Sequence, residues 1–389
     1  MIETDFILKD FSLENINNGS FTWKTPSNIA LVKYWGKQEP QIPENASISF
    51  TLDACFTLTT LEFKLKRELL PKNDSSSDVE MLKQVQHDIS KVAERSRSHS
   101  FEIYFEGKKK EDFKPKIATF FKRIEQYVPF LTEFEFVIKS ENSFPHSSGI
   151  ASSASGMGAL ALCVMSLEKA LNPTMTDEYF NKKASFLARL GSGSACRSIE
   201  GPLIVWGNHP EIEGSSDLFG VPFPYKIHDN FKNYQDTILL VDEGEKQVSS
   251  TVGHNLMHNH PFAKQRFQQA NSNISKISKV LQSGDLSAFI AIVESEALSL
   301  HAMMMTSNPY FILMKPNTLK IINEIWVFRA QTNSNICFTL DAGANVHVLF
   351  PEKEKETVNN FIKSNLMQFC QENHYICDVI GEGATSIFN

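Results

Sequence analysis

A run of small residues, PHSSGIASSASG from Pro145 to Gly156, separates a strand-like stretch from a helix-like one. Thr132–Lys139 before it has the alternating pattern of a strand, and Met157–Leu167 after it places apolar side chains at helical spacing. Small residues let backbone N–H groups approach an anion, and a helix start supplies unpaired donors with a partial positive charge. The pattern therefore predicts a strand, a loop and a helix in succession, with phosphate as the ligand of the loop.

The same segment lacks the G-x-x-x-x-G-K-[ST] pattern, so it is not a P-loop. A turn that only caps a buried helix is the alternative interpretation. Five serines and two glycines crowd these twelve residues directly at the helix start, which favours anion binding. The candidate ATP-phosphate ligands are Ser147, Gly149, Ser152, Ser153, Ser155 and Gly156.

Three further segments carry polar groups suited to an anionic substrate. GSGSACRS, Gly191–Ser198, alternates Gly with Ser, and its Arg197 offers a planar fork for a carboxylate or phosphate. Asp341 in DAGAN follows an apolar strand, and SNIALVKYWGK, Ser27–Lys37, combines two lysines with two aromatic residues. Each has a structural alternative, namely an ion pair, a turn and a core contact. Their presence together in one chain favours a functional site.

Length and composition limit the remaining possibilities. A chain of 389 residues exceeds the usual size of one core, so we expect two domains with the site between them. Hydrophobic residues make up 42% of the chain and charged residues 21%, as in a globular protein. The net charge of −7 argues against a nucleic-acid partner. Six cysteines without C-x-x-C spacing fit reduced, mostly buried thiols in a cytoplasmic protein.

The chain starts with acidic residues rather than a signal peptide, and we expect no apolar stretch of membrane-spanning length and no membrane partner. The Gly/Pro/Ser-rich passage after Trp206 suits an interdomain crossing. We therefore divide the chain into domains 1–205 and 206–389, with a polar insertion at about 68–99 in the first. Interleaved strands and helices predict an α+β second domain.

PSNIALVKYWGK, ENSFPHSSGIASSASG, GSGSACRS and LDAGAN resemble, in this order, the four signature segments of the mevalonate diphosphate decarboxylases. That family belongs to the superfamily of galactokinase, homoserine kinase, mevalonate kinase and phosphomevalonate kinase. The resemblance implies the α+β, two-domain fold of these small-molecule kinases. Its N-terminal ATP-binding domain is ribosomal S5-like and its C-terminal domain is ferredoxin-like.

The resemblance also implies roles for individual residues. Asp341 matches the acid near the C3 hydroxyl, as a general base or an electrostatic aid, and Lys33 matches the lysine near the reacting groups. Arg197 would hold the substrate carboxylate, and Ser153 would contact ATP phosphates and the metal. The matching substrate-binding positions are Tyr34 and Lys37 on the phosphate side, and Ser192, Ser194 and Arg197.

The implied reaction is the ATP-dependent decarboxylation of (R)-5-diphosphomevalonate to isopentenyl diphosphate, with Mg²⁺, in a cytoplasmic homodimer. The alternatives are a phosphomevalonate decarboxylase, a mevalonate 3-kinase, and a non-catalytic protein that binds phosphate ligands. Two departures from the family stand out. Ala344 replaces a frequent Pro, and the strand at Phe101–Ile103 lacks an arginine that contacts phosphate in some relatives. The second departure leaves the choice between monophosphate and diphosphate open.

Overall fold

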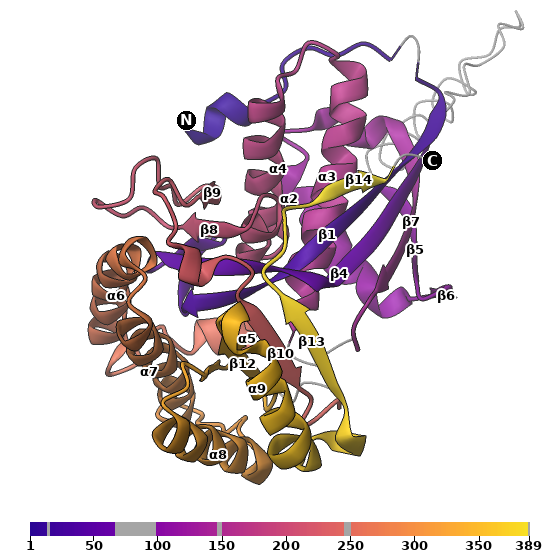
Figure 1. The fold of residues 1–389 in the computed structure, drawn as a ribbon. Coiled ribbons are helices and arrows are strands. Elements are labelled where there is room, and N and C mark those ends of the chain that lie inside the picture. Colours follow the sequence, from indigo (N-terminus) through magenta and orange to yellow (C-terminus); the bar gives the residue numbers. More distant parts are fainter. Residues whose placement is uncertain (14–15, 67–98, 146–149, 245–249, 388–389) are drawn as a thin grey trace, which may run out of the picture.

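The computed structural model describes residues 1–13, 16–66, 99–145, 150–244 and 250–387. It contains a large mixed sheet with helices on it, followed by a smaller antiparallel sheet with its own helices (Figure 1). The predicted mixed α+β class is confirmed. Residues 68–98 of the insertion predicted at about 68–99, together with Ser147 and Gly149 of the small-residue loop, lie outside the described residues.

The larger sheet is built around two long strands, β1 (Asn18–Val32) and β4 (Ser47–Leu65), which pair antiparallel. Its strand order is β14-β1-β4-β7-β5-β6, and β8 and β9 extend it beside the first residues of β4. Only β5 and β7 pair in parallel within the described residues. The other bounds are β5 (Ser100–Phe105), β6 (Lys108–Lys109), β7 (Phe134–Asn142), β8 (Leu203–Trp206), β9 (Val221–Pro222) and β14 (Thr385–Ile387).

Three helices cover the larger sheet, namely α2 (Lys114–Ile124), α3 (Ser152–Leu171) and α4 (Asp177–Gly191). Helix α3 packs on β1 and β4, with α4 beside it. A Cβ at Gly158 would lie 2.9 Å from Thr25 Cγ2, so glycine permits the close approach of α3 to β1. Thr176 caps α4 by accepting a hydrogen bond from the Tyr179 N–H, as its position before two acidic residues predicts.

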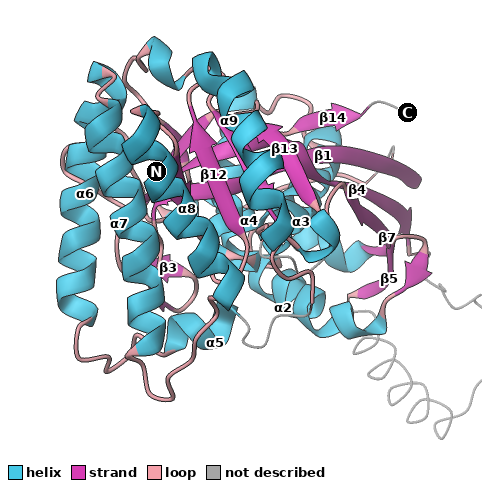
Figure 2. Cartoon of the chain, turned by 60° about the horizontal axis from the view of Figure 1, so that its bottom comes forward, coloured by secondary structure: helices cyan, strands magenta, loops and turns pink. Residues whose placement is uncertain are grey.

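The smaller sheet has the order β11-β12-β10-β13, and all its pairs are antiparallel. Along the chain, α8 lies between β10 and β11, and α9 lies between β12 and β13. This is the ferredoxin-like βαββαβ arrangement. Figure 2 shows α8 and α9 in front of β12 and β13. The bounds are β10 (Gln235–Leu239), α8 (Pro316–Thr332), β11 (Cys337–Thr339), β12 (Val346–Phe350), α9 (Lys355–Phe361) and β13 (Tyr375–Val379).

Helices α6 (Ala263–Ser283) and α7 (Leu286–Met305) connect the two sheets. Ile29 and Leu31 of β1 and Phe50 of β4 share a hydrophobic core with these helices and with Ile238 of the smaller sheet. A β-strand turns alternate side chains to opposite faces, so neighbouring Leu239 instead joins the core under α8 and α9. The last residues of β1 thus belong to the larger sheet and also pack against α7.

Helices α3 and α7 are long and apolar enough to cross a membrane by length and composition alone. This corrects the expectation that no apolar stretch reaches that length. Within these helices, 72% and 50% of the most apolar window is buried inside the protein, because α3 packs on β1 and β4, and α7 on α6 and β11. The absence of a membrane partner stays a prediction.

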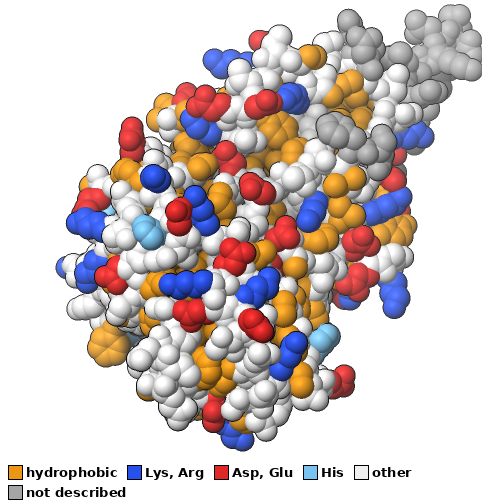
Figure 3. Space-filling model, in the orientation of Figure 1, with side chains coloured by type: hydrophobic (Ala, Val, Ile, Leu, Met, Phe, Trp, Pro, Cys, Tyr) orange, Lys and Arg blue, Asp and Glu red, His pale blue; other side chains and the backbone are white. Residues whose placement is uncertain are grey.

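Five cysteines are buried and Cys377 is exposed, and all six are free thiols, as expected. On the face shown in Figure 3, basic and acidic side chains are interspersed rather than gathered by sign. The domain division at 205/206 stays a prediction. Strand β14 pairs with β1 in the larger sheet, so Thr385–Ile387 lie with the first half of the chain.

Candidate active site

A cavity of about 670 Å³ opens between the two sheets, and it gathers residues from all four sequence motifs. Its walls come from the end of β1, the start of α3, the GSGSACRS turn, helix α2 and the loop after β11. The predicted site residues that line it are Lys33, Tyr34, Lys37, Ser152, Ser153, Ser192, Ser194, Arg197 and Asp341.

Lys33 and Asp341 form an ion pair within this cavity. Lys33 Nζ lies 3.0 Å from Asp341 Oδ1, and the side chains are 2% and 27% exposed. Burial lowers the pKa of Lys33, whereas the carboxylate of Asp341 opposes that shift. The carboxylate is the more accessible member of the pair, and both residues line the cavity.

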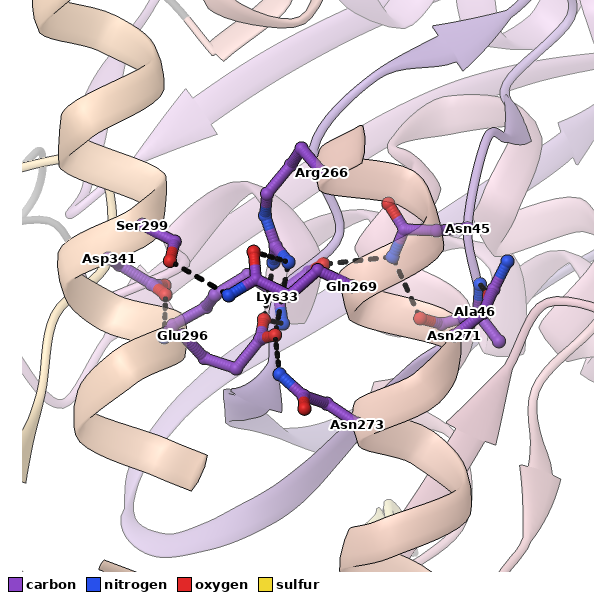
Figure 4. A network of polar contacts seen from close by, with 10 residues as sticks. All are labelled: Lys33, Asn45, Ala46, Arg266, Gln269, Asn271, Asn273, Glu296, Ser299 and Asp341. Carbon is purple, nitrogen blue, oxygen red and sulfur yellow. Dashed lines mark hydrogen bonds and ion pairs between the residues drawn. The ribbon is translucent and has the colours of Figure 1, made fainter. Parts of the chain in front are cut away.

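The backbone of Lys33 is held from both sides (Figure 4). Its N–H donates to Glu296 Oε2 of α7 at 2.9 Å, and its C=O accepts from Asn45 Nδ2 at 3.0 Å. Glu296 is fully buried and also accepts hydrogen bonds from Arg266, in an ion pair, and from Asn273 Nδ2 at 2.6 Å, both on α6. A buried, fully paired carboxylate of this kind fixes where strand β1 ends.

Arg197 is buried at the back of the cavity. Its Nε donates to Ser49 Oγ and its Nη1 donates to Ser47 Oγ at 2.7 Å, both on β4. The guanidinium also lies 5.6 Å from the ring of Trp206. These neutral partners orient the fork without cancelling its charge, so the positive charge stays available to an anion.

The GSGSACRS turn is anchored by neighbours that the sequence does not reveal. Asn28 Nδ2 donates to Ser194 O at 3.2 Å and to Ser198 Oγ at 2.7 Å. A Cβ at Gly193 would lie 2.8 Å from Trp206 Cη2 and 2.9 Å from Tyr34 Oη. Glycine is therefore needed for the turn to pack on both rings.

The start of α3 has the features of an anion site. Ala151 takes the left-handed conformation with φ of 46°, which costs about 1–2 kcal/mol for a residue with a Cβ. Among the described residues, no side chain caps the helix start. Ser153 Oγ accepts a hydrogen bond from Lys116 Nζ of α2 and donates to Ser192 Oγ at 3.3 Å. Helix dipole, hydroxyls and lysine together favour phosphate oxygens here.

Tyr34 and Lys37 also line the cavity. The Tyr34 hydroxyl is buried and has no hydrogen-bond partner within the described residues. Lys37 Nζ donates to Gln41 Oε1 at 2.9 Å, and burial lowers the pKa of Lys37. An enclosed hydroxyl without a partner costs free energy unless a ligand satisfies it.

A second cavity of about 190 Å³ lies on the other side of the α3 start. Ser152, Ser153 and Lys116 line both cavities, while Ile103, Phe105 and Met157 give the second one apolar walls. Thr57 and Asn142 add polar groups. An apolar space with a polar edge beside a phosphate site suits a nucleoside.

The structure modifies part of the predicted phosphate loop. Ser155 is fully buried, and its hydroxyl is 2.6 Å from Thr57 Oγ1, so it lines neither cavity and anchors α3 to β4. The prediction that Ser155 contacts ATP finds no support in this position. Gly156 lines the second cavity only, and Ser147 and Gly149 are outside the described residues.

The segment Phe101–Ile103, which lacks the arginine that contacts substrate phosphate in some relatives, lies in strand β5. Glu102 of β5 binds Lys109 and Tyr104, and the strand reaches the second cavity rather than the first. Helix α2 instead brings Lys116 and Arg123 to the first cavity. The lack of an arginine in β5 therefore does not leave the first cavity short of cations.

Sequence reasoning missed four residues that shape this site: Lys116, Arg123, His254 and Glu296. Lys116 and Arg123 lie seven positions apart on α2, so they face one side of a helix, and this spacing could have been noticed. Glu296 and His254 carry no such signal, because only tertiary packing brings them to β1.

The hydroxyl groups at the start of α3 are suited to Mg²⁺ that is bound mainly by nucleotide phosphates. Within the described residues no group of three or more His, Cys, Asp or Glu could form a metal centre. Ser153 and Ser192 offer hydroxyls at the phosphate end, and Mg²⁺ typically keeps waters and phosphates around few protein ligands.

Comparison with known proteins supports the same interpretation. Residues 25–217 match the diphosphomevalonate decarboxylase-like N-terminal domain, and residues 237–382 match the mevalonate 5-diphosphate decarboxylase C-terminal domain. The diphosphomevalonate decarboxylase mvd1 of Aspergillus fumigatus is 28% identical over 356 residues, covering 89% of this chain and 80% of the relative. The Saccharomyces cerevisiae diphosphomevalonate decarboxylase is 29% identical over 347 residues, covering 85% and 78%.

Solved structures agree over nearly the whole length. A mevalonate diphosphate decarboxylase from Enterococcus faecalis is 25% identical, with a TM-score of 0.74, covering 96% of this chain and 100% of that one. A structure described as MDDEF in complex with MVAPP, AMPPCP and magnesium is 27% identical, with the same TM-score and coverage. With both family domains matched in order around a cavity that unites all four motifs, the chain belongs to the diphosphomevalonate decarboxylase family.

Proposed function

We propose that this protein decarboxylates (R)-5-diphosphomevalonate, consuming ATP and releasing isopentenyl diphosphate, ADP, phosphate and CO₂. The observation that carries the proposal is the Lys33–Asp341 pair, which faces the same cavity as Arg197 and the start of α3. These groups can together bind the hydroxyl and the carboxylate of one substrate and the phosphate group that is transferred to it. The related structures with MVAPP, AMPPCP and magnesium support the same set of ligands.

The residues divide the substrate by its chemistry. Arg197, oriented by two serines, suits the carboxylate, which must be held without being protonated. Asp341 suits the tertiary hydroxyl at C3, next to Lys33. Tyr34 and Lys37 suit the diphosphate, because they supply a cation and a hydroxyl that has no hydrogen-bond partner among the described residues, and both line the same cavity.

The first chemical step moves the γ-phosphoryl group of ATP to the C3 hydroxyl. The start of α3 with Ser153 and Lys116 would bind the phosphates, and the second cavity would take the nucleoside. Asp341 accepts the hydrogen bond, and in the base role the proton, of the attacking hydroxyl. Mg²⁺ bound to the phosphates would neutralise part of their charge during transfer.

The second step releases phosphate and CO₂. The C3–O bond breaks and phosphate leaves with its electron pair, so C3 becomes electron-deficient. The bond to the carboxylate carbon then breaks, and its electrons form the C2–C3 double bond. Asp341 and Arg197 line the same cavity, where the carboxylate of Asp341 would stabilise the electron-deficient carbon and Arg197 would hold the departing carboxylate.

One assay separates this proposal from its rivals. The protein is incubated with ATP, Mg²⁺ and mevalonate, its 5-phosphate or its 5-diphosphate, and ADP and CO₂ are measured together. Equal ADP and CO₂ from the diphosphate is the expected result. Preference for the monophosphate would identify a phosphomevalonate decarboxylase, ADP without CO₂ would identify a kinase, and neither product would point to a binding protein.

We also propose a cytoplasmic homodimer that binds neither nucleic acid nor membranes. The net charge of −7 and the free cysteines support this proposal. Sedimentation equilibrium of the purified protein at several concentrations tests the dimer, because the measured mass of a dimer is twice the chain mass of 43.9 kDa.

A further inference from the structure

His254 is a polar side chain of the cavity wall that the proposed chemistry does not yet use. It lies in the short helix α5 (Ser250–Asn255) and is 8% exposed. Its ring packs against Tyr34 and Trp35, with centroid distances of 4.2 and 4.8 Å. The two aromatic residues of the KYWGK segment therefore fix the position of the imidazole.

The backbone of the same segment fixes its tautomer. The Gly36 N–H donates to His254 Nδ1 at 3.0 Å. A nitrogen that accepts a hydrogen bond carries no proton, so the neutral ring must carry its proton on Nε2. Gly36 has φ of 106°, and a Cβ there would lie 2.7 Å from the ring of Phe267, so only glycine places this N–H without strain.

The charge of the ring is fixed as well. Burial, followed by the nearby cations Lys37 and Arg197, lowers the pKa of His254 to about 3. The charged side chains that act on the ring are thus both positive. Near neutral pH, His254 is an uncharged donor in a corner with two cations.

The Nε2–H group is left for a ligand. Within the described residues it has no hydrogen-bond partner, and Nε2 is not among the atoms sealed from solvent without a partner. The ring lines the cavity next to the unpartnered Tyr34 hydroxyl and to Lys37. An anionic oxygen in the cavity would accept a hydrogen bond from Nε2 and would lie close to Lys37, whose Nζ is 3.6 Å from Glu39 Oε1.

We propose that His254 donates a hydrogen bond from Nε2 to the phosphate end of the substrate, and that it helps to determine specificity for that end. This inference rests on the proposed function, which it deepens by assigning the residue that receives the diphosphate. A neutral donor adds a hydrogen bond without adding a third positive charge to a buried corner.

The test compares two replacements of the ring by steady-state kinetics with mevalonate 5-diphosphate. His254→Phe keeps the aromatic packing and removes the donor, whereas the amide nitrogen of His254→Gln reaches the position of Nε2. We expect His254→Phe to raise KM about tenfold with kcat and KM for ATP within about twofold. His254→Gln should bring KM back to within about threefold of the parent value.

Exposed His258, three residues after α5, provides the matched control, and His258→Phe should leave KM unchanged. An unchanged KM in His254→Phe would overturn the proposal. So would a KM in His254→Gln as high as in the Phe variant, because then the ring and not the donor would matter. If His254→Phe does not fold, as judged by its melting curve, His254→Met makes the same comparison.

Failure of the proposed function would show itself separately, as a parent protein that releases no CO₂. In that case calorimetric titration with inorganic diphosphate still tests His254. Weaker binding to His254→Phe than to His254→Gln would support the anion donor, and equal binding would overturn it.

Discussion

Lys33 Nζ lies 3.0 Å from Asp341 Oδ1, so one ion pair joins the end of strand β1 to the loop after strand β11. Lys33 follows a strand of the larger sheet and Asp341 follows a strand of the smaller sheet, so neither sheet supplies both members of the pair. The relative position of the two sheets therefore determines the geometry of this pair, and changes to either partner should affect turnover more than folding.

Replacement of the acid tests this directly. Asp341→Asn removes the negative charge beside C3 but keeps the size of the side chain, so we expect kcat to fall by about 10²–10⁴-fold. ATP binding, measured by calorimetry, should change by less than about threefold, because the proposed nucleotide site lies at the start of α3. Exposed Asp229→Asn is the control. Turnover by Asp341→Asn within a few-fold of the parent would contradict the assigned role.

The buried carboxylate behind Lys33 leads to a second prediction. Glu296→Gln leaves Arg266 without its charge partner and weakens the bond to the Lys33 N–H, so it should lower both the melting temperature and kcat. Glu294→Gln on the same helix breaks a less buried pair with Arg329, whose Nη1 is 2.6 Å from Glu294 Oε1. It should lower the melting temperature alone. Equal kcat in the two variants would show that Glu296 only stabilises the fold.

Helix α2 provides a third prediction. Lys116→Ala removes the lysine that contacts Ser153 at the start of α3, so KM for ATP should rise about tenfold, because a charge-assisted hydrogen bond to phosphate is lost. KM for the diphosphate should change less. Lys122→Ala, an exposed lysine on the same helix, should leave both constants at the parent values.

Two buried histidines predict how stability depends on pH. Burial lowers the pKa of His254 to about 3 and that of His301, whose Nε2 lies 3.1 Å from Asp341 O, to about 4. Below the ordinary pKa of about 6.5 the unfolded chain therefore binds protons that the folded protein does not. Their contribution to stability is complete above pH 6.5 and is lost as the pH falls toward 4.

Urea unfolding at pH 7.0, 6.0 and 5.0 measures this loss. Each histidine should contribute up to about 1.4 kcal/mol per pH unit to the fall in unfolding free energy. His254→Gln should make the fall shallower, whereas exposed His258→Gln should not. A slope unchanged by His254→Gln would contradict the shifted pKa.

Much of the fold could be predicted from periodicity. The sequence predicts a strand at Val346–Phe350 and helices around 258–282 and 285–304. Strand β12 and helix α7 match to within one residue at each end, whereas helix α6 begins five residues later than predicted, at Ala263. Strand β1 is not among the sequence-based predictions, because Pro26 interrupts the segment that contains it. The structure accommodates this proline at a register shift between Pro26 and Asn28, which single-sequence patterns do not reveal.

The sequence predicted those site residues that belong to short, recognisable motifs. Lys33, Arg197 and Asp341 lie in three segments far apart in sequence, and the cavity brings them together. Glu294 and Glu296, by contrast, look alike on helix α7, yet only Glu296 reaches the backbone of Lys33. The side of a helix that meets a given strand depends on packing over the whole molecule, so the sequence of α7 alone could not distinguish them.

The pairing of β14 with β1 also affects how the protein is made. Residues Thr385–Ile387 bind the outer edge of β1 at Thr22–Lys24, so this edge stays open on the ribosome until translation has reached the last strand. An open strand edge can pair with other chains. During synthesis, this edge of the nascent larger sheet therefore stays available for pairing with other chains until β14 is added.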